Sequence, residues 1–208
     1  MSTPSPFLPK PTLTSRLIEL RPFDDEAITA ILEILADPVV LMKTGSVHSE
    51  GAAHVPHSIE TYRRWYHTRN EQPDRLDLAI WDKQRQEYVG EVVFNEYNGL
   101  NRSVNYRIAI GERGRGRGLG TEATQLMINY GFQDLNLNRI ELEVYEFNER
   151  ARYVYTSCGF VTEGRRRQAL YYNGEFHDAL IKSIIRSEWE ENRSLAAMHT
   201  AKIPKVTL

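Results

Sequence analysis

The sequence predicts an α/β domain built on one mixed β-sheet, and three observations indicate this class. Three runs of alternating apolar residues between Leu76 and Ile110 are separated only by short polar turns, which makes them antiparallel neighbours. A further strand pattern, Arg139–Phe147, follows a helical segment and must therefore run parallel to the strand before that helix. Asn173-Gly174 lies between two more alternating runs and is the strongest short signal of a β-hairpin.

Length and composition indicate one globular domain. A chain of 208 residues, of which 41% are hydrophobic and 26% charged, is long enough to bury a core. The formal net charge of −2 gives no reason to expect nucleic acid or membrane lipid as a partner. One cysteine excludes an internal disulfide and, with no secretory leader or apolar span in the sequence, predicts a cytoplasmic protein.

The N-terminal part is expected to hold an arm, a strand and a helix. Four of the nine prolines fall before residue 12, so residues 1–12 are expected to form a flexible arm. Alternation over Arg16–Phe23 predicts a short strand, and the two aspartates that follow cap a helix that reaches about Ala36 and is ended by Pro38.

A loop over Lys43–His57 follows, and Ser58 then caps a second helix that reaches about Asn70. The loop carries three histidines, which indicate either a metal site or a solvated loop: His48, His54 and His57. No cysteine nearby supports the metal, so none is expected.

The remaining elements follow from the same periodicities. Helices are expected over Leu119–Leu135 and from Asn148 to about Ser157, where Gly159 stops the second helix. The strands are expected at Leu76–Trp81, Tyr88–Tyr97, Ser103–Ile110, Arg139–Phe147, Phe160–Tyr172 and Glu175–Ile185. One domain over residues 13–188 contains them all, and residues 189–208 are expected to be a polar tail with no core face.

The segment Arg113–Thr121, which reads R-G-R-G-R-G-L-G-T, joins a strand to a helix and has the outline of a phosphate cradle. Glycine has no Cβ, so its backbone reaches unusual dihedral angles and can approach an anion closely. The first N–H groups of the following helix are unpaired and carry the positive end of the helix dipole. Three arginines in the segment add positive charge.

Other interpretations of the segment are weaker. A P-loop is excluded because no Gly-Lys-Ser/Thr occurs. A dinucleotide fingerprint fits Gly118-Leu119-Gly120 loosely, but the preceding strand alternates, whereas the first strand of that fold is buried on both faces. An RGG-type nucleic-acid tract would be longer and disordered. A mere flexible turn would not need so many glycines, which lose much backbone entropy on ordering.

Two blocks of the sequence match one enzyme family. Arg115-x-x-Gly118-x-Gly120 resembles the pyrophosphate motif of the GNAT N-acetyltransferases, R/Q-x-x-G-x-G/A. The later block Leu142-Glu143-Val144, Asn148, Ala151, Tyr155 and Gly159-Phe160 resembles the segment L-E-V…N-x-x-A-x-x-x-Y-x-x-x-G-F of the same family. The opening Ser15–Pro22 and the closing hairpin around Asn173-Gly174 are similar to the RimJ/RimL-like branch, which acetylates N-termini of ribosomal proteins.

The resemblance implies a GNAT-type sheet of about seven strands flanked by helices and splayed between the fourth and fifth strands. It also implies acetyl-CoA as acyl donor and no metal. The residues that would bind the cofactor are Ile108, Ala109, Ile110, Arg113, Arg115, Gly116, Arg117, Gly118, Leu119, Gly120, Thr121, Asn148 and Arg152. In this interpretation the strand residues pair with the pantetheine arm through their backbone, and one N–H polarises the thioester carbonyl.

Two residues are expected to handle protons. The resemblance places Glu143 on the strand that faces the cofactor, where partial burial would raise its pKa and make it a general base. The alternatives are an ion pair with Arg107 or another basic side chain, with Glu96 or a water as the base. Tyr155 is expected to protonate the departing thiolate, or else to be a core aromatic residue.

The sequence therefore predicts an N-acetyltransferase that acts on a primary amine, either a protein N-terminus or a small molecule, by direct attack. A covalent route through Cys158 is disfavoured because no histidine lies near it in the sequence. The rival functions are a non-catalytic acyl-CoA sensor on the same fold and a nicotinamide-dependent enzyme. The proline-rich arm and the tail are elements that two copies could exchange, so a homodimer is a further expectation.

Overall fold

The computed structural model describes residues 5–53 and 59–201. Their strands are β1 Leu13–Thr14, β2 Ile18–Arg21, β3 Leu76–Asp82, β4 Glu87–Asn98, β5 Ser103–Ile110, β6 Arg139–Tyr145, β7 Val161–Tyr172 and β8 Glu175–Ile185. The helices are α1 Asp25–Leu35, α2 Pro38–Lys43, α3 Glu50–Ala53, α4 Ile59–His67, α5 Leu119–Gln133, α6 Glu149–Ser157 and α7 Arg186–Ala201, with 3₁₀ turns at Arg69–Glu71 and Glu112–Gly114.

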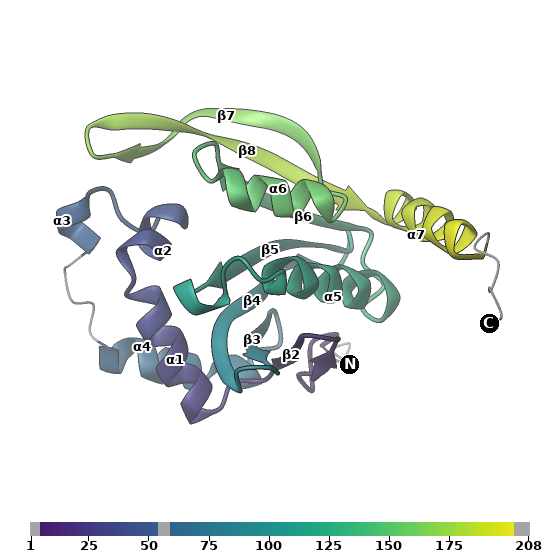
Figure 1. Ribbon diagram of the computed structural model, residues 1–208, viewed down its shortest axis with the longest axis horizontal. Coiled ribbons are helices and arrows are strands. Elements are labelled where there is room, and N and C mark those ends of the chain that lie inside the picture. The colour runs from purple at the N-terminus through teal and green to yellow at the C-terminus, as the bar shows by residue number, and fades with distance from the viewer. Residues whose placement is uncertain (1–4, 54–58, 202–208) are drawn as a thin grey trace, which may run out of the picture.

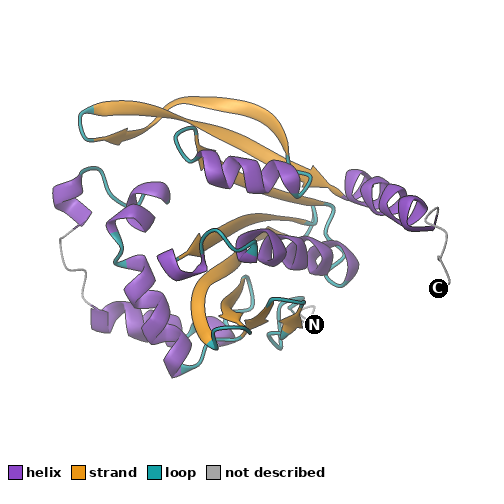
Figure 2. Ribbon diagram, viewed as in Figure 1, coloured by secondary structure: helices purple, strands orange, loops and turns teal. Residues whose placement is uncertain are grey.

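The strands form one mixed sheet in the order β1-β2-β3-β4-β5-β6-β8-β7, with helices on both faces (Figures 1 and 2). This confirms the predicted α/β class, and the sheet has 8 strands rather than about seven because β1 adds a two-residue edge. The parallel pair is β5 and β6, as expected from the helix between them.

The sheet splays open between β5 and β6. The two strands pair only from Ser103–Asn105 to Arg139–Glu141, although β5 continues to Ile110 and β6 to Tyr145. These are the fourth and fifth strands of the sequence-based expectation, so the predicted splay is confirmed. Beyond Asn105 the edge of β5 that faces β6 has no strand partner in the described parts of the chain.

Two clusters of apolar side chains hold the sheet. The larger one lies between the sheet and α5, where Val92, Tyr106, Met127 and Phe160 are buried. The smaller one joins β3 and β4 to α1 and α4 on the other face, through Ile31, Tyr66 and Tyr88, among others. The alternation of β5 follows from this: Val104 and Tyr106 enter the larger core, and Asn105 and Arg107 face the opposite side.

Several local expectations are confirmed. Asp24 caps α1 by accepting a hydrogen bond from the Ala27 N–H at 2.7 Å. Asn148 caps α6, and Gly159 follows that helix with a φ of +98°. At the tip of the β7–β8 hairpin, Asn173 and Gly174 have φ values of +48° and +88°, which is the two-residue turn that matches the twist of the strands.

Other expectations need correction. Pro38 was expected only to end α1, but it is also the first residue of α2. A proline is tolerated at this position because the first helical N–H needs no partner, and Asp37 caps the helix. The predicted loop over Lys43–His57 contains the short helix α3. His54, His57 and Ser58 lie outside the described residues.

Both ends of the domain are packed more closely than expected. Phe7 is fully buried and its ring lies 5.1 Å from that of Tyr97, so residues 5–12 pack on the domain and are not the flexible arm expected there. Residues 186–201 form α7, and Trp189 packs on Phe132 with ring centroids 5.3 Å apart. The expected polar tail therefore begins with a helix that has a core contact.

Candidate active site

The glycine-rich loop has the conformation that its spacing predicted. Gly116 and Gly118 have φ values of +81° and +79°, which strongly favour glycine, while a Cβ on either would meet nothing within 4 Å. The first helical hydrogen bond of α5 runs from the Glu122 N–H to the Gly118 carbonyl at 3.0 Å. The N–H groups of Leu119, Gly120 and Thr121 precede that bond, so they have no partner within α5 and are available to donate to an anion.

The three arginines of the loop do different things. Arg113 is largely exposed and donates to Glu87 at 2.9 Å, and Arg117 is bonded to Asp82. These two pairs tie the loop to the β3–β4 turn, and neither arginine lines the cavity described next. Arg115 does line it, and its Nε donates to the Ile110 carbonyl at 3.2 Å. Only one of the three arginines is thus positioned as expected.

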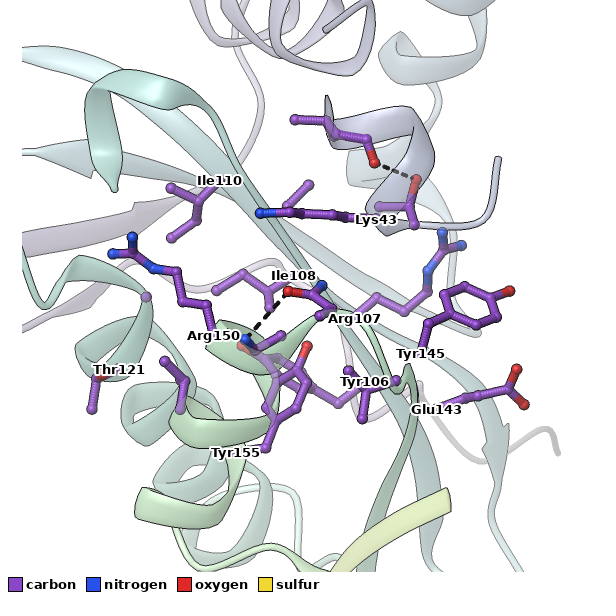
Figure 3. Close-up of a pocket in the computed structure, with 18 of the residues that line it drawn as sticks. Lys43, Tyr106, Arg107, Ile108, Ile110, Thr121, Glu143, Tyr145, Arg150 and Tyr155 are labelled. Carbon is purple, nitrogen blue, oxygen red and sulfur yellow. Dashed lines mark hydrogen bonds between the residues drawn. The ribbon is translucent and has the colours of Figure 1, made fainter. Parts of the chain in front are cut away.

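A cavity of about 510 Å³ passes through the splay, which is within the range of ~300–1,000 Å³ typical of ligand sites. Its wall is made by β5, β6, the N-termini of α5 and α6, and the end of α2 (Figure 3). The expected cofactor-binding residues in this wall are Ile108, Ala109, Ile110, Arg115, Gly118, Leu119, Gly120, Thr121 and Asn148. Arg113, Gly116, Arg117 and Arg152 are not among the lining residues.

Two cationic side chains lie at the loop end of the cavity, and the sequence did not predict that they belong to the site. Figure 3 shows Lys43 and Arg150 pointing toward the end of the cavity that Ile110 marks. Burial and the nearby charges of Arg115 and Arg150 lower the pKa of Lys43, so the three cations lie close together. Asp37, 3.4 Å from Arg115, also acts on Lys43 but opposes this shift. Lys43 is far from the glycine loop in the sequence, and nothing pointed to it. Arg150 follows the Asn148 cap by two residues, and this position could have suggested Arg150 as a site residue.

Tyr155 lies in the wall with its hydroxyl directed into the cavity (Figure 3). It is 6% exposed, and its ring packs edge-on against Tyr106 and Phe160 at 6.3 and 5.7 Å. Burial raises its pKa, so the hydroxyl stays protonated at neutral pH. Tyr155 is both a core aromatic residue and a hydroxyl that faces the cavity.

Glu143 lines the same cavity, with its carboxylate directed away from Tyr155 (Figure 3), and is bonded to Arg166 of β7. The structure therefore contains an ion pair, the alternative that the sequence left open, with Arg166 in place of Arg107. Glu96 also lines the cavity, and its side chain has no ion pair or hydrogen bond with any residue that the structure describes. Its φ of +53° coincides with an irregularity in the β4–β5 pairing between Asn95 and Asn98.

Arg152, an expected cofactor-binding residue, and Cys158, whose covalent role was disfavoured, both lie outside the cavity. Arg152 donates to the Glu146 carbonyl at 3.0 Å and lines a separate surface pocket with Tyr153 and Lys182. Cys158 does not line the cavity, and burial raises the pKa of its thiol to about 11, so it is not an ionised nucleophile at neutral pH.

Among the described residues no group of three or more His, Cys, Asp or Glu side chains could hold a metal ion. None of the described helices is long and apolar enough to cross a bilayer.

Comparison with known proteins assigns the fold and the loop to one family. The family described as "Acetyltransferase (GNAT) domain" matches residues 17–161. The chain belongs to the GNAT acetyltransferases. This confirms the family that the glycine loop and the Asn148–Phe160 block indicated.

The names of individual GNAT relatives refer to different acceptors. "Putative ribosomal N-acetyltransferase YdaF" of Bacillus subtilis is 34% identical over 101 residues, 49% of this chain and 55% of that protein. Spermidine N(1)-acetyltransferase of Escherichia coli is 31% identical over 124 residues, 56% of this chain and 67% of that protein. The matches thus span about half to two thirds of these relatives. A crystal structure of spermidine N-acetyltransferase from Vibrio cholerae with CoA and spermine superimposes with a TM-score of 0.74 at 22% identity, over 84% of this chain and 98% of that one, and shares the fold.

Proposed function

We propose that this GNAT protein transfers the acetyl group of acetyl-CoA to a primary amine by direct attack in a ternary complex. The observation that carries the proposal is the single cavity through the splay, which joins the glycine loop to Tyr155 and Glu143. An anion site at one end and proton-handling groups at the other are what the reaction needs. A non-catalytic sensor would need only the first of these.

The residues present fit the acyl donor. The loop backbone from Gly118 to Thr121 would hold the diphosphate, with Lys43, Arg115 and Arg150 around it. The free edge of β5 over Ile108–Ile110 would pair with the amides of the pantetheine arm as an added strand. Asn148, whose side chain lines the cavity, supplies a further hydrogen-bonding group. Bound acetyl-CoA supplies an acetyl group activated as a thioester.

The reaction forms a nitrogen–carbon bond and breaks a carbon–sulfur bond, so one proton must leave the amine and one must reach the sulfur. We assign the second proton to the Tyr155 hydroxyl, which burial keeps protonated and whose oxygen faces the cavity. We assign the first to Glu143, with Glu96 as the alternative base. The Arg166 pair orients Glu143 at the cavity wall.

Three finer expectations remain part of the proposal. The similarity to YdaF supports a RimJ/RimL-like acceptor, and the similarity to spermidine acetyltransferases supports a small amine. A homodimer and a cytoplasmic location are predictions that size-exclusion chromatography with light scattering and cell fractionation can check.

The test is to mix the purified full chain with acetyl-CoA and a panel of amines. Thiol release and a mass increase of one acetyl group on the acceptor are the expected results. Binding of CoA without thiol release for any amine would support the sensor, and binding of NAD but not CoA would support the nicotinamide enzyme.

A further inference from the structure

The cavity has an acceptor half that lies away from the glycine loop, and its charges indicate what kind of amine it accepts. This half is lined by the polar groups of β4, β5, β6 and β7: Asn95, Glu96, Asn105, Arg107, Glu143, Tyr145 and Arg166. Figure 3 shows Arg107, Glu143 and Tyr145 together on the side opposite Arg150 and Thr121. The inference below rests on the proposed function, because it concerns the second substrate of that same reaction.

Arg107 is a charged residue of this half, and its charge acts on Glu91, Tyr145 and Tyr155. It lies on the face of β5 that points away from the main core, and its side chain is exposed in the cavity next to Tyr145 (Figure 3). Its side chain has no ion pair or hydrogen bond with any residue in the described parts of the chain. A guanidinium has five N–H donors in a planar fork, which fits the two oxygens of a carboxylate.

The carboxylates near Arg107 do not neutralise it. Glu143 is already bonded to Arg166. Glu91 interacts with the charge of Arg107, but it accepts a hydrogen bond from the Tyr66 hydroxyl at 2.9 Å and is not a lining residue. Burial raises the pKa of Glu91 to about 7, so near neutral pH it carries only part of a charge.

The acceptor half is therefore not the acidic chamber that a polycation would require. Glu96 is the one lining carboxylate of this half, among the described residues, that has no cationic partner, and Arg107 offers a cation without an ion pair in the same half. A ligand that complements both carries one amine and one carboxylate. A polyamine would bring several positive charges toward Arg107 and Arg166, with an unfavourable interaction at each.

We propose that the acceptor is a small amine that carries a carboxylate, of the amino-acid type, and that Arg107 is the specificity-determining residue that binds this carboxylate. Arg107 directly precedes Ile108 on β5, so the guanidinium extends from the strand segment assigned to the pantetheine arm. The carboxylate would thereby hold the amine beside the acyl group. Transfer then proceeds as described above, with the carboxylate unchanged.

The experiment compares amino acids with their amides, which keep the amine and lose the carboxylate charge. Thiol release from acetyl-CoA is measured with the full chain for the twenty amino acids, their amides, spermidine, and a short peptide with a neutral N-terminal residue and an amidated C-terminus. At least one amino acid is expected to exceed its amide in kcat/KM by about tenfold or more, as a charge-assisted hydrogen bond allows. Spermidine and the neutral peptide are expected to be poorer still.

Arg107→Gln should remove most of this preference, since it should lower kcat/KM for the amino acid and leave its amide nearly unchanged. Arg107→Lys should restore part of it. Arg64→Gln, the same change on the exposed surface of α4, is the matched control. Spermidine, the neutral peptide or an amide as the best acceptor would overturn the inference, as would an equal loss for amino acid and amide in Arg107→Gln. Absence of thiol release with every amine would instead contradict the proposed function.

Discussion

Nδ1 of His48 lies 2.9 Å from the carbonyl oxygen of Tyr171, although the two residues are separated by 123 positions in the sequence. The His48 carbonyl accepts a hydrogen bond from the Asn173 N–H at 3.1 Å, and the Asn173 side chain accepts one from the Glu50 N–H at 3.1 Å. These three bonds form a clasp between the tip of the β7–β8 hairpin and the segment between α2 and α3 (Figure 1). The β7–β8 hairpin is thus tied at its tip to the segment between α2 and α3, far from the β5–β6 pairing that joins the two halves of the sheet.

The clasp can be opened by one conservative change. Asn173→Gly removes the side-chain acceptor and keeps the positive φ that this turn requires. We expect faster hydrogen exchange at the Glu50 amide, since a single hydrogen bond contributes about 0.5–1.5 kcal/mol, with little change in global stability. Exchange measured by mass spectrometry on peptides covering residues 46–53 checks this, and unchanged protection there would mean that the clasp does not persist in solution.

The glycine loop should depend on Gly118. Gly118→Asp places a carboxylate in open space at the start of α5, where we propose that the diphosphate binds, so acetyl-CoA affinity measured by calorimetry should be lost. Gly174→Asp is the matched control, because it has a similar φ of +88°, is equally open, and lies at the hairpin tip. Equal affinities of the two variants would contradict the phosphate cradle.

Tyr155→Phe should lower kcat by ~10²–10⁴, the range for loss of a general acid, while acetyl-CoA affinity stays close to that of the unmodified protein. The fold should tolerate the change because the ring keeps its contacts with Tyr106 and Phe160. Tyr106→Phe, which removes a buried hydroxyl 3.0 Å from that of Thr124, controls for the loss of a buried polar group. An unaffected kcat in Tyr155→Phe would assign the proton donor to another group.

The base can be assigned by comparing Glu143→Gln with Glu96→Gln. Both side chains line the cavity, so both variants keep its shape, and only the true base should lower kcat/KM by about 10²–10⁴ across the pH range. We expect the loss in Glu143→Gln. A loss confined to Glu96→Gln would reassign the role, and a small effect in both would indicate a water.

Glu91 makes the stability of the protein depend on pH in a definite direction. Burial raises its pKa from 4.5 to about 7, so between these values the folded state holds more protons than the unfolded state. Stability must therefore fall as pH rises from about 4.5 toward 7, by on the order of 3 kcal/mol from this group. Glu91→Gln should remove this dependence and raise the melting temperature at pH 8 relative to the parent protein. A parallel pH dependence in both proteins, followed by thermal unfolding, would show that Glu91 is not responsible.

The site was only partly predictable, and the reason lies in sequence distance. The loop glycines, the Asn148 cap and the Asn173-Gly174 turn depend on their immediate neighbours, so their spacing was sufficient to predict them. The partners of the loop arginines were not predictable, because Arg113 meets Glu87 across 26 positions and Arg117 meets Asp82 across 35. Arg113 and Arg117, which were expected to bind phosphate, therefore hold the loop in place through these ion pairs. Lys43 and Arg150 line the cavity instead.

The sequence by itself determined the order of strands β2 to β8 and of helices α1, α4, α5 and α6, the parallel return of β6 and the positive-φ glycines before α5, since periodicity and backbone sterics act over a few residues. Only the tertiary structure decided which charges are satisfied. Glu143 pairs with Arg166, and the Arg107 side chain has no ion pair or hydrogen bond among the described residues; both facts arise where the open splay meets the hairpin. Electrostatic complementarity depends on distances in space, and these exist only once β5, β6 and β7 have assembled.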